Sequence, residues 1–178
     1  MIGVNVAGLL REPPGTVRAV ALEVPATGFG PSLALAKPVR GVVRLQRTNR
    51  GLLVSGPITT SVWRTCVRCL DDFVADTAIT VNEEFLPSVD VGSGAPLPVD
   101  ATDADARRID AHHELDLGPI VREELVLAES MHAVCRPDCP GLCPGCGRHL
   151  DVGRCECDVA SLDPRLAGLA RFRPPDGR

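Results

Sequence analysis

Six cysteines lie within 23 residues near the C-terminus, and their type and spacing are suited to binding a metal ion. They are Cys135, Cys139, Cys143, Cys146, Cys155 and Cys157. Two residues separate Cys143 from Cys146, a spacing that lets one tight turn present two thiolates to a tetrahedral ion. Gly145 and Gly147 let backbone N–H groups approach the sulfurs and stabilise their negative charge. We therefore expect Zn2+ in this segment.

A structural zinc site needs four ligands, so the central pair Cys143 and Cys146 needs partners. The candidates are the pair Cys155 and Cys157, the pair Cys135 and Cys139, and the single residue His149. The neighbours of His149 favour a turn histidine instead. Spacing alone leaves the choice of ligands open.

A separate pair, Cys66 and Cys69, follows a predicted strand, and three interpretations are open for it. The two residues are half-buried thiols, a redox-active pair, or ligands of a second ion. A redox C-x-x-C motif normally uses a helix N-terminus beside a βαβ unit, which an antiparallel strand does not supply. Eight sulfurs would suit two four-thiolate sites. In that arrangement Cys66 and Cys69 join Cys135 and Cys139, and the other four cysteines form the second site.

Residues for catalysis are hard to find in the sequence. The cluster His112-His113-Glu114 lacks a nearby nucleophile and the His-Glu-x-x-His pattern of zinc proteases. No phosphate-binding glycine loop or nucleophile elbow is present. We expect a protein that is not an enzyme and that has no small-molecule substrate.

The 178 residues can bury one main core and support a small additional module. No stretch approaches the roughly 20 apolar residues that span a bilayer. The N-terminus lacks the basic and apolar regions of a signal peptide. These features predict a cytoplasmic protein without a membrane partner, in which cysteines bind metal instead of forming disulfides.

Charge is strongly segregated along the chain. Residues 37–70 carry seven cationic side chains and no acid, whereas residues 71–129 carry fifteen acids and three arginines. Such segregation favours a basic surface for an anionic partner beside an acidic surface, although the charges could instead pair across the fold. Six arginines are the candidates for contact with the phosphates of an anionic partner such as a nucleic acid: Arg40, Arg44, Arg47, Arg50, Arg64 and Arg68. Trp63 could stack on a base if it is exposed.

Alternating apolar residues and turn signals predict an antiparallel meander. The predicted strands are 17–24, 39–47, 52–54 continued by 58–65 after an interruption at 55–57, and 73–86. A hairpin turn is expected at 48–51, and the arginines of its two strands would share one exposed face. Residues 87–111 should form a long acidic loop.

One main helix is expected after Asp116, whose carboxylate can cap it, with Leu117, Val121 and Leu125 in an apolar stripe. A short last helix is expected at 164–171. The predicted fold class is α+β: a small antiparallel sheet or partly closed barrel, packed by that helix, with a C-terminal zinc-binding module. We expect residues 1–130 to form the α+β domain and residues 131–178 to form the cysteine-rich zinc module and tail.

Three stretches together resemble the YceD family. Residues 63–70, Trp-Arg-Thr-Cys-Val-Arg-Cys-Leu, resemble its C-x-R-C signature. Residues 114–125 are similar to its acidic, leucine-rich helix entry. The cysteines of 135–147, with Cys155 and Cys157, resemble the tail of its cysteine-rich members. The resemblance runs from about residue 10 to residue 160.

The resemblance implies a role in accumulation of 23S ribosomal RNA and thus in large ribosomal subunit biogenesis. It also implies metal binding, because the cysteine-rich members are described so. The expected partners are the pre-50S particle, its ribosomal RNA or a ribosomal protein. The alternatives are an acidic adaptor that shields a basic ribosomal protein and, from another class, a thiol redox sensor using Cys66 and Cys69. The resemblance supplies no catalytic residues.

Overall fold

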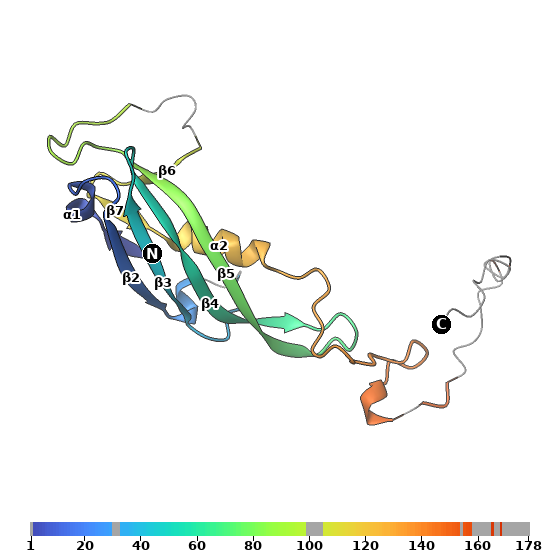
Figure 1. Cartoon of the computed structure of the whole chain (residues 1–178). Coiled ribbons are helices and arrows are strands. Elements are labelled where there is room, and N and C mark those ends of the chain that lie inside the picture. The colour runs from blue at the N-terminus through green and yellow to red at the C-terminus, as the bar shows by residue number, and fades with distance from the viewer. Residues whose placement is uncertain are drawn as a thin grey trace.

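The computed structural model describes residues 2–29, 33–98, 105–153 and 155–157, together with Arg165 and Gly168. Its main element is a five-stranded sheet in the order β2-β3-β4-β5-β6 (Figure 1). The strands are β2 (Val17–Val24), β3 (Val39–Arg47), β4 (Leu52–Thr65), β5 (Asp72–Pro87) and β6 (Arg107–Ile109). The first four form the expected antiparallel meander, and β6 joins β5 in parallel.

A small second sheet and a helix cover one face of the meander. Strand β1 (Gly3–Asn5) pairs with β7 (Glu114–Asp116), and the helices are α1 (Ala7–Leu10) and α2 (Gly118–Leu127). Two single turns of 3-10 helix are η1 (Ala26–Phe29) and η3 (Leu150–Val152). Asp116 Oδ1 accepts the N–H groups of Ile2 and Gly118, both at 2.9 Å. The N-cap position of α2 is Leu117, one residue after the expected cap, and the Asp116 carboxylate links the N-terminal strand to the first residue of the helix.

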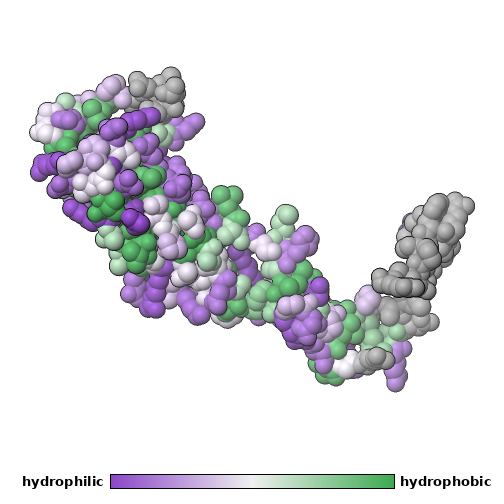
Figure 2. Space-filling model, in the orientation of Figure 1, coloured by the Kyte–Doolittle hydropathy of each residue, from purple (hydrophilic) through white to green (hydrophobic). Residues whose placement is uncertain are grey.

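The core lies between α2 and one face of the sheet. Alternate residues of β4, among them Leu52, Val54 and Ile58, are fully buried, and Val121 and Leu125 of α2 are buried with them. Each such side chain contributes about 1.5–3 kcal/mol relative to exposure. Figure 1 shows α2 behind the sheet, so Figure 2 presents the opposite face, where apolar and hydrophilic residues are mixed. That face is solvent-exposed, as is common in antiparallel sheets.

The interruption predicted at 55–57 is confined to one side of β4. Gly56 and Pro57 stay in register with Val81 and Thr80 of β5, whereas the ladder with β3 skips them. Proline has no N–H to donate, and a Cβ on Gly56 would lie 2.5 Å from the carbonyl oxygen of Val42. The strand therefore continues while one of its two ladders is broken.

Two further expectations are corrected by the topology. The sheet is not a barrel, because β2 and β6 lie at its opposite edges. The segment 87–111 is not all loop, because residues 107–109 form β6 against the end of β5. The helix expected at 164–171 falls outside the described residues, apart from Arg165 and Gly168. No described helix is long and apolar enough to cross a membrane.

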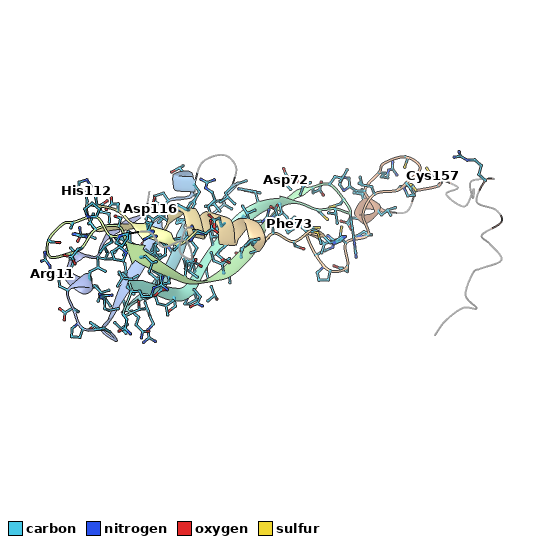
Figure 3. The ribbon with its side chains drawn as sticks, turned by 90° about the horizontal axis from the view of Figure 1, so that it is seen from above. Arg11, Asp72, Phe73, His112, Asp116 and Cys157 are labelled. Carbon is cyan, nitrogen blue, oxygen red and sulfur yellow. The ribbon has the colours of Figure 1, made fainter. Side chains whose placement is uncertain are left out.

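Strands β4 and β5 extend beyond β3 as a two-stranded ribbon, and the cysteine-rich segment lies at the end of this ribbon (Figure 1). Figure 3 shows Arg11 and His112 at one end of the molecule, Asp72 and Phe73 toward the other, and Cys157 beyond them. The ribbon thus carries Cys66 and Cys69 toward the remaining cysteines.

Candidate metal centre

The first cysteine pair lies in the turn that joins β4 to β5. The Cys66 N–H donates to the carbonyl of Asp71 at 2.8 Å, and the Leu70 N–H donates to the carbonyl of Cys66 at 2.9 Å. Leu70 completes this turn with a φ of 63°, a left-handed conformation that is unfavourable for a leucine. The turn places both cysteines at the tip of the ribbon.

The segment that follows α2 is fastened to this tip by polar contacts. Val67 donates its N–H to the carbonyl of Ala133 at 2.9 Å. Arg68 Nη1 donates to the carbonyls of Pro137 and Cys139 at 3.2 and 2.9 Å. Arg64 also forms an ion pair with Glu129. These contacts bring Cys135 and Cys139 to the same point as the ribbon cysteines.

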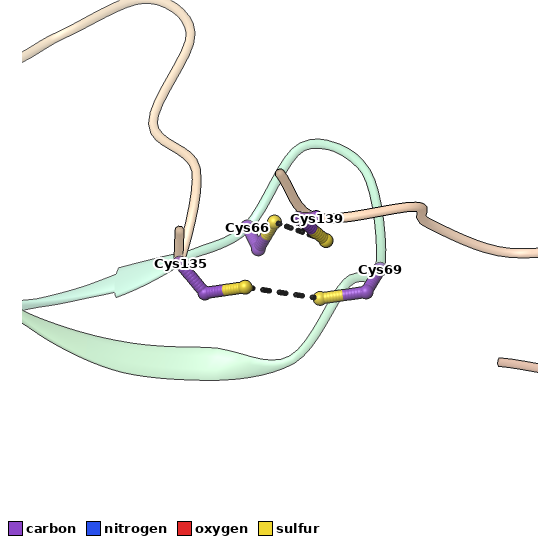
Figure 4. A group of neighbouring side chains, drawn as sticks. All are labelled: Cys66, Cys69, Cys135 and Cys139. Atoms are coloured by element: carbon purple, nitrogen blue, oxygen red, sulfur yellow. Dashed lines mark hydrogen bonds between the residues drawn. The ribbon is translucent and has the colours of Figure 1, made fainter. Parts of the chain in front are cut away.

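The four sulfurs of Cys66, Cys69, Cys135 and Cys139, here called the first tetrad, all lie within 4.8 Å of one another (Figure 4). The Cys66–Cys139 and Cys69–Cys135 sulfur distances are both 3.8 Å. A tetrahedral ion with metal–sulfur bonds of about 2.3 Å requires sulfur–sulfur separations of about 3.8 Å. The first tetrad therefore has the dimensions of a tetrahedral metal site.

Burial supports the same interpretation. Cys66, Cys69 and Cys139 are buried, and Phe73 and Val134 pack against them. Buried thiolates need a compensating positive charge, and a divalent cation at their centre supplies it. The residues of the first tetrad thus fit a metal ion in type, geometry and environment.

The other four cysteines, Cys143, Cys146, Cys155 and Cys157, form a second tetrad whose sulfurs also lie within 4.8 Å of one another. Its knuckle has the expected form, because the Gly145 N–H approaches the Cys143 sulfur at 3.4 Å. The Cys143–Cys155 sulfur distance is 3.0 Å, shorter than a tetrahedral ion requires. Cys143 is buried, whereas Cys146 is exposed. The second tetrad is therefore the more open and less regular of the two.

In each tetrad, one cysteine has a lowered pKa, which favours its negatively charged thiolate form. The backbone N–H of Cys69 is the main cause that lowers the pKa of Cys66 to about 6. The hydrogen bond from Cys155 is the main cause that lowers the pKa of Cys143 to about 6. A hydrogen bond with Cys146 contributes most to raising the pKa of Cys157 to about 12. Ionisation of one thiol thus opposes ionisation of its neighbours until a cation is present.

In the first tetrad, the thiols of Cys69 and Cys135 have raised pKa values. The Asp71 N–H acts to lower the pKa of Cys69, but burial and the neighbouring thiols raise it to about 12. Burial is the largest cause of the raised pKa of Cys135. Both thiols would lose their protons when a metal ion binds.

The segment that carries the second tetrad packs against the ribbon turn that carries Cys66 and Cys69. A Cβ on Gly141, whose φ is 77°, would lie 2.9 Å from the carbonyl oxygen of Arg68. His149 Nδ1 lies 3.5 Å from a carboxylate oxygen of Asp71, and Arg136 forms ion pairs with Asp138 and Asp151. His149 therefore contacts the ribbon turn and belongs to neither tetrad. The first tetrad takes two cysteines from each side of residue 130.

The structure does not gather the six candidate RNA-binding arginines on one face. Arg40 and Arg44 lie on the open face of β3, where Arg40 is bound to Glu23 at 2.7 Å. Arg47 donates instead to the carbonyls of Leu10, Thr48 and Gly51. The remaining three are Arg50 in the hairpin turn, Arg64 paired with Glu129, and Arg68 beside the first tetrad. Alternation along the strands separates Arg47 from Arg44, because 47 and 44 point to opposite faces.

Sequence reasoning missed the structural role of Arg68. It lies between Cys66 and Cys69 of the first tetrad, and its guanidinium donates to the carbonyl of a third member, Cys139. Its position inside the C-x-R-C motif was the available signal, since an arginine between two metal ligands is well placed to donate to the segment that brings the others.

The sequence matches the family described as "Large ribosomal RNA subunit accumulation protein YceD" over residues 54–173. The chain belongs to this family. The matched region contains β4 from Val54 onward, β5, α2 and all eight cysteines. The expected family resemblance is thereby confirmed.

Mycobacterial proteins are similar to this member of the family. Uncharacterized protein Rv2926c of Mycobacterium tuberculosis is 28% identical over 146 residues, which cover 75% of this chain and 61% of the relative. Uncharacterized protein Mb2951c of Mycobacterium bovis has the same identity and coverage. Uncharacterized protein ML1660 of Mycobacterium leprae is 26% identical over 171 residues, covering 92% of this chain and 74% of the relative. No solved structure matches the chain.

Proposed function

We propose that the protein is a zinc-stabilised, non-enzymatic factor that acts in the cytoplasm to support accumulation of the large ribosomal subunit. The observation that carries this proposal is the family match over residues 54–173, because the matched region contains both cysteine tetrads. The family description names the process, which is accumulation of the large ribosomal subunit RNA. The two cysteine tetrads are the sites at which zinc would stabilise the fold.

Zinc is the metal that the ligands favour. Four thiolates in a tetrahedral arrangement are typical of zinc or iron, and the Cys143–Cys146 knuckle is a common zinc-binding turn. Four protein ligands leave no position for a substrate or a reactive water, as in structural zinc sites. A closed site of this kind supports a structural role for the metal and a non-enzymatic role for the protein.

The first zinc ion would fasten the ribbon to the segment after α2. Its ligands would come from two distant parts of the chain: Cys69 and Cys135 are 66 residues apart, and Cys66 and Cys139 are 73 residues apart. Closing so long a loop in the unfolded chain is entropically unfavourable, so the metal would add to the hydrogen bonds and the ion pair that hold this arrangement.

A protein partner is favoured over direct RNA contact by the state of the arginines. Arg40, Arg47 and Arg64 each engage acceptors of the protein itself, which leaves fewer of the six candidates for phosphates. The acidic adaptor is therefore the second candidate function. A redox role for Cys66 and Cys69 is disfavoured, because both thiols are buried in the first tetrad.

Depletion of the protein in a bacterium that carries it tests the proposal. We expect the ratio of large- to small-subunit ribosomal RNA to fall, and wild-type protein to restore it. The Cys66→Ser variant should restore it less, whereas Glu12→Gln, at an exposed site far from the tetrads, should restore it fully. An unchanged ratio after depletion would contradict the proposed function.

A further inference from the structure

The chain has one tryptophan, and it is half-exposed on the open face of the ribbon. Trp63 of β4 is 51% exposed, while its neighbour Val62 points into the protein and is buried. Val74 of β5 lies directly opposite Trp63 in the ladder and is 42% exposed. An aromatic and an aliphatic side chain thus form an apolar pair that stays about half exposed in the part of the chain that the structure describes.

Two carboxylates flank this pair. Asp72 and Asp76 lie two residues before and after Val74, so all three side chains point to the same face of the sheet. Asp72 accepts a hydrogen bond from Thr65 Oγ1 at 2.8 Å, and Asp76 accepts one from Ser61 Oγ at 2.5 Å. These hydroxyl groups fix the two carboxylates on the face of the sheet that carries Trp63. The Asp76 side chain is still 85% exposed.

Among the described residues, Lys37 forms an ion pair with one of these carboxylates. Lys37 Nζ lies 3.4 Å from Asp76 Oδ1, at the edge away from Asp72. The hydrogen bond from Ser61, followed by the charge of Lys37, lowers the pKa of Asp76, so its carboxylate is ionised at physiological pH. The surface formed by Trp63, Val74, Asp72 and Asp76, here called the Trp63 patch, therefore combines an exposed ring with a net negative charge.

We infer that the Trp63 patch binds a basic, extended segment of a protein partner, with an arginine or lysine side chain over the indole ring. A cation over a tryptophan face is attracted by the ring electrons, and flanking carboxylates add ion pairs. A nucleic acid fits less well. A base stacked on Trp63 would bring its phosphates close to Asp72 and Asp76, and like charges repel. The inference deepens the proposed function and rests on it, because it names the chemistry of the partner.

The tryptophan itself reports on this surface, because the chain contains no tyrosine and no second tryptophan. The full, zinc-loaded protein is titrated with a peptide of alternating arginine and alanine and, separately, with a uridine oligonucleotide, while Trp63 emission is followed. We expect a saturable change with the peptide and none with the oligonucleotide. A dilution series without ligand should leave the emission unchanged.

Variants separate local contacts from general charge. Asp72→Asn with Asp76→Asn should weaken peptide binding about tenfold, since two exposed ion pairs together contribute up to about that factor. Glu12→Gln with Glu114→Gln changes the net charge equally at distant sites and should leave binding within about twofold. With a fluorescently labelled peptide, Trp63→Leu should weaken binding about threefold or more, because the cation loses the ring face.

Four results would overturn the inference: no response to the peptide, an equal loss in both double variants, saturable quenching by the oligonucleotide that strengthens in Asp72→Asn with Asp76→Asn, or emission that changes with protein concentration alone. The third would assign the patch to RNA and the fourth to a second copy of the chain. If depletion lowers large-subunit RNA while the peptide gives no response, the proposed function stands and only the patch assignment fails.

Discussion

The sulfur atoms of Cys66 and Cys139 lie 3.8 Å apart although the two residues are separated by 73 positions in the chain. One comes from the turn at the end of the ribbon, and the other from the segment that follows α2. The main hydrophobic core does not include them, because the buried cysteines form a separate cluster with Phe73 and Val134. The contact between these two segments therefore depends strongly on the first tetrad, whereas the sheet is stabilised by its own hydrophobic core.

Replacing a ligand of the first tetrad should release the cysteine-rich segment and leave the sheet folded. In Cys66→Ser we expect one zinc ion per chain to be lost. The loss removes folding free energy, because structural zinc contributes an apparent 10–16 kcal/mol in small zinc modules. Limited proteolysis should then cut near residues 129–139, while circular dichroism retains the β signal of the main core.

Cys146→Ser provides the matched comparison. This ligand belongs to the second tetrad, so one zinc ion should again be lost while residues 129–139 stay protected. Equal protease sensitivity in both variants would show that the two tetrads do not have the separate roles that their positions indicate.

The two tetrads should also differ in how fast they lose metal. Cys146 is exposed, whereas three of the four cysteines in the first tetrad are buried. A chelator or an oxidant therefore reaches the second tetrad first, and zinc should leave in two phases, each of one equivalent. A chromogenic zinc indicator follows the release, and alkylation with mass spectrometry should find Cys146 modified before Cys66. A single phase of two equivalents would contradict this order.

Metal binding to the first tetrad should depend on pH, because its thiols differ in pKa. The pKa of Cys66 is lowered to about 6 from an ordinary value of 9.0, so its thiolate stabilises the metal-free fold fully above pH 9, and this contribution is lost as the pH falls toward 6. The pKa values of Cys69 and Cys135 are raised, so near neutral pH both would release protons when the metal binds.

Calorimetry in buffers of different ionisation enthalpy measures these protons, with Cys143→Ser used to isolate the first tetrad. We expect at least two protons per ion near neutral pH, and more protons with weaker binding below pH 6, where Cys66 is protonated as well. Proton release that does not rise on acidification would show that Cys66 is not ionised in the metal-free protein.

Substitution of Gly141 should loosen the contact between the two tetrads. In Gly141→Ala the new Cβ meets the Arg68 carbonyl at 2.9 Å, and the φ of 77° is unfavourable for alanine. The strain of the left-handed conformation alone is about 1–2 kcal/mol. We expect faster zinc release from the second tetrad. Leu70→Gly, which relieves the same kind of strain in the ribbon turn, should not accelerate release.

The grouping of the cysteines could be anticipated because the chemistry is simple. Eight thiols in closely spaced pairs suit two four-ligand ions, and the structure brings together the same two groups of four. The strands at 17–24, 39–47 and 73–86 were also predictable, since alternation and the turn at 48–51 mark them. Zinc as the bound metal stays a prediction.

Other features depend on contacts that a sequence does not display. Arg47 and Arg68 look like surface cations, but each donates to backbone carbonyls that tertiary folding brings near. Strand β6 has three residues and forms only because it meets the end of β5. At Gly56 and Pro57 the pairing of β4 with β3 is broken, whereas its pairing with β5 continues. Which of the two pairings is broken depends on the position of the neighbouring strands, which the sequence does not show.

Native mass spectrometry of the protein, purified under reducing conditions without added metal, tests the two-tetrad arrangement most directly. Two four-cysteine sites predict the mass of the chain plus two zinc ions, falling to one ion in Cys66→Ser and one in Cys146→Ser, and to none when both are combined. A single ion in the wild-type protein, or loss of both ions in either single variant, would contradict it.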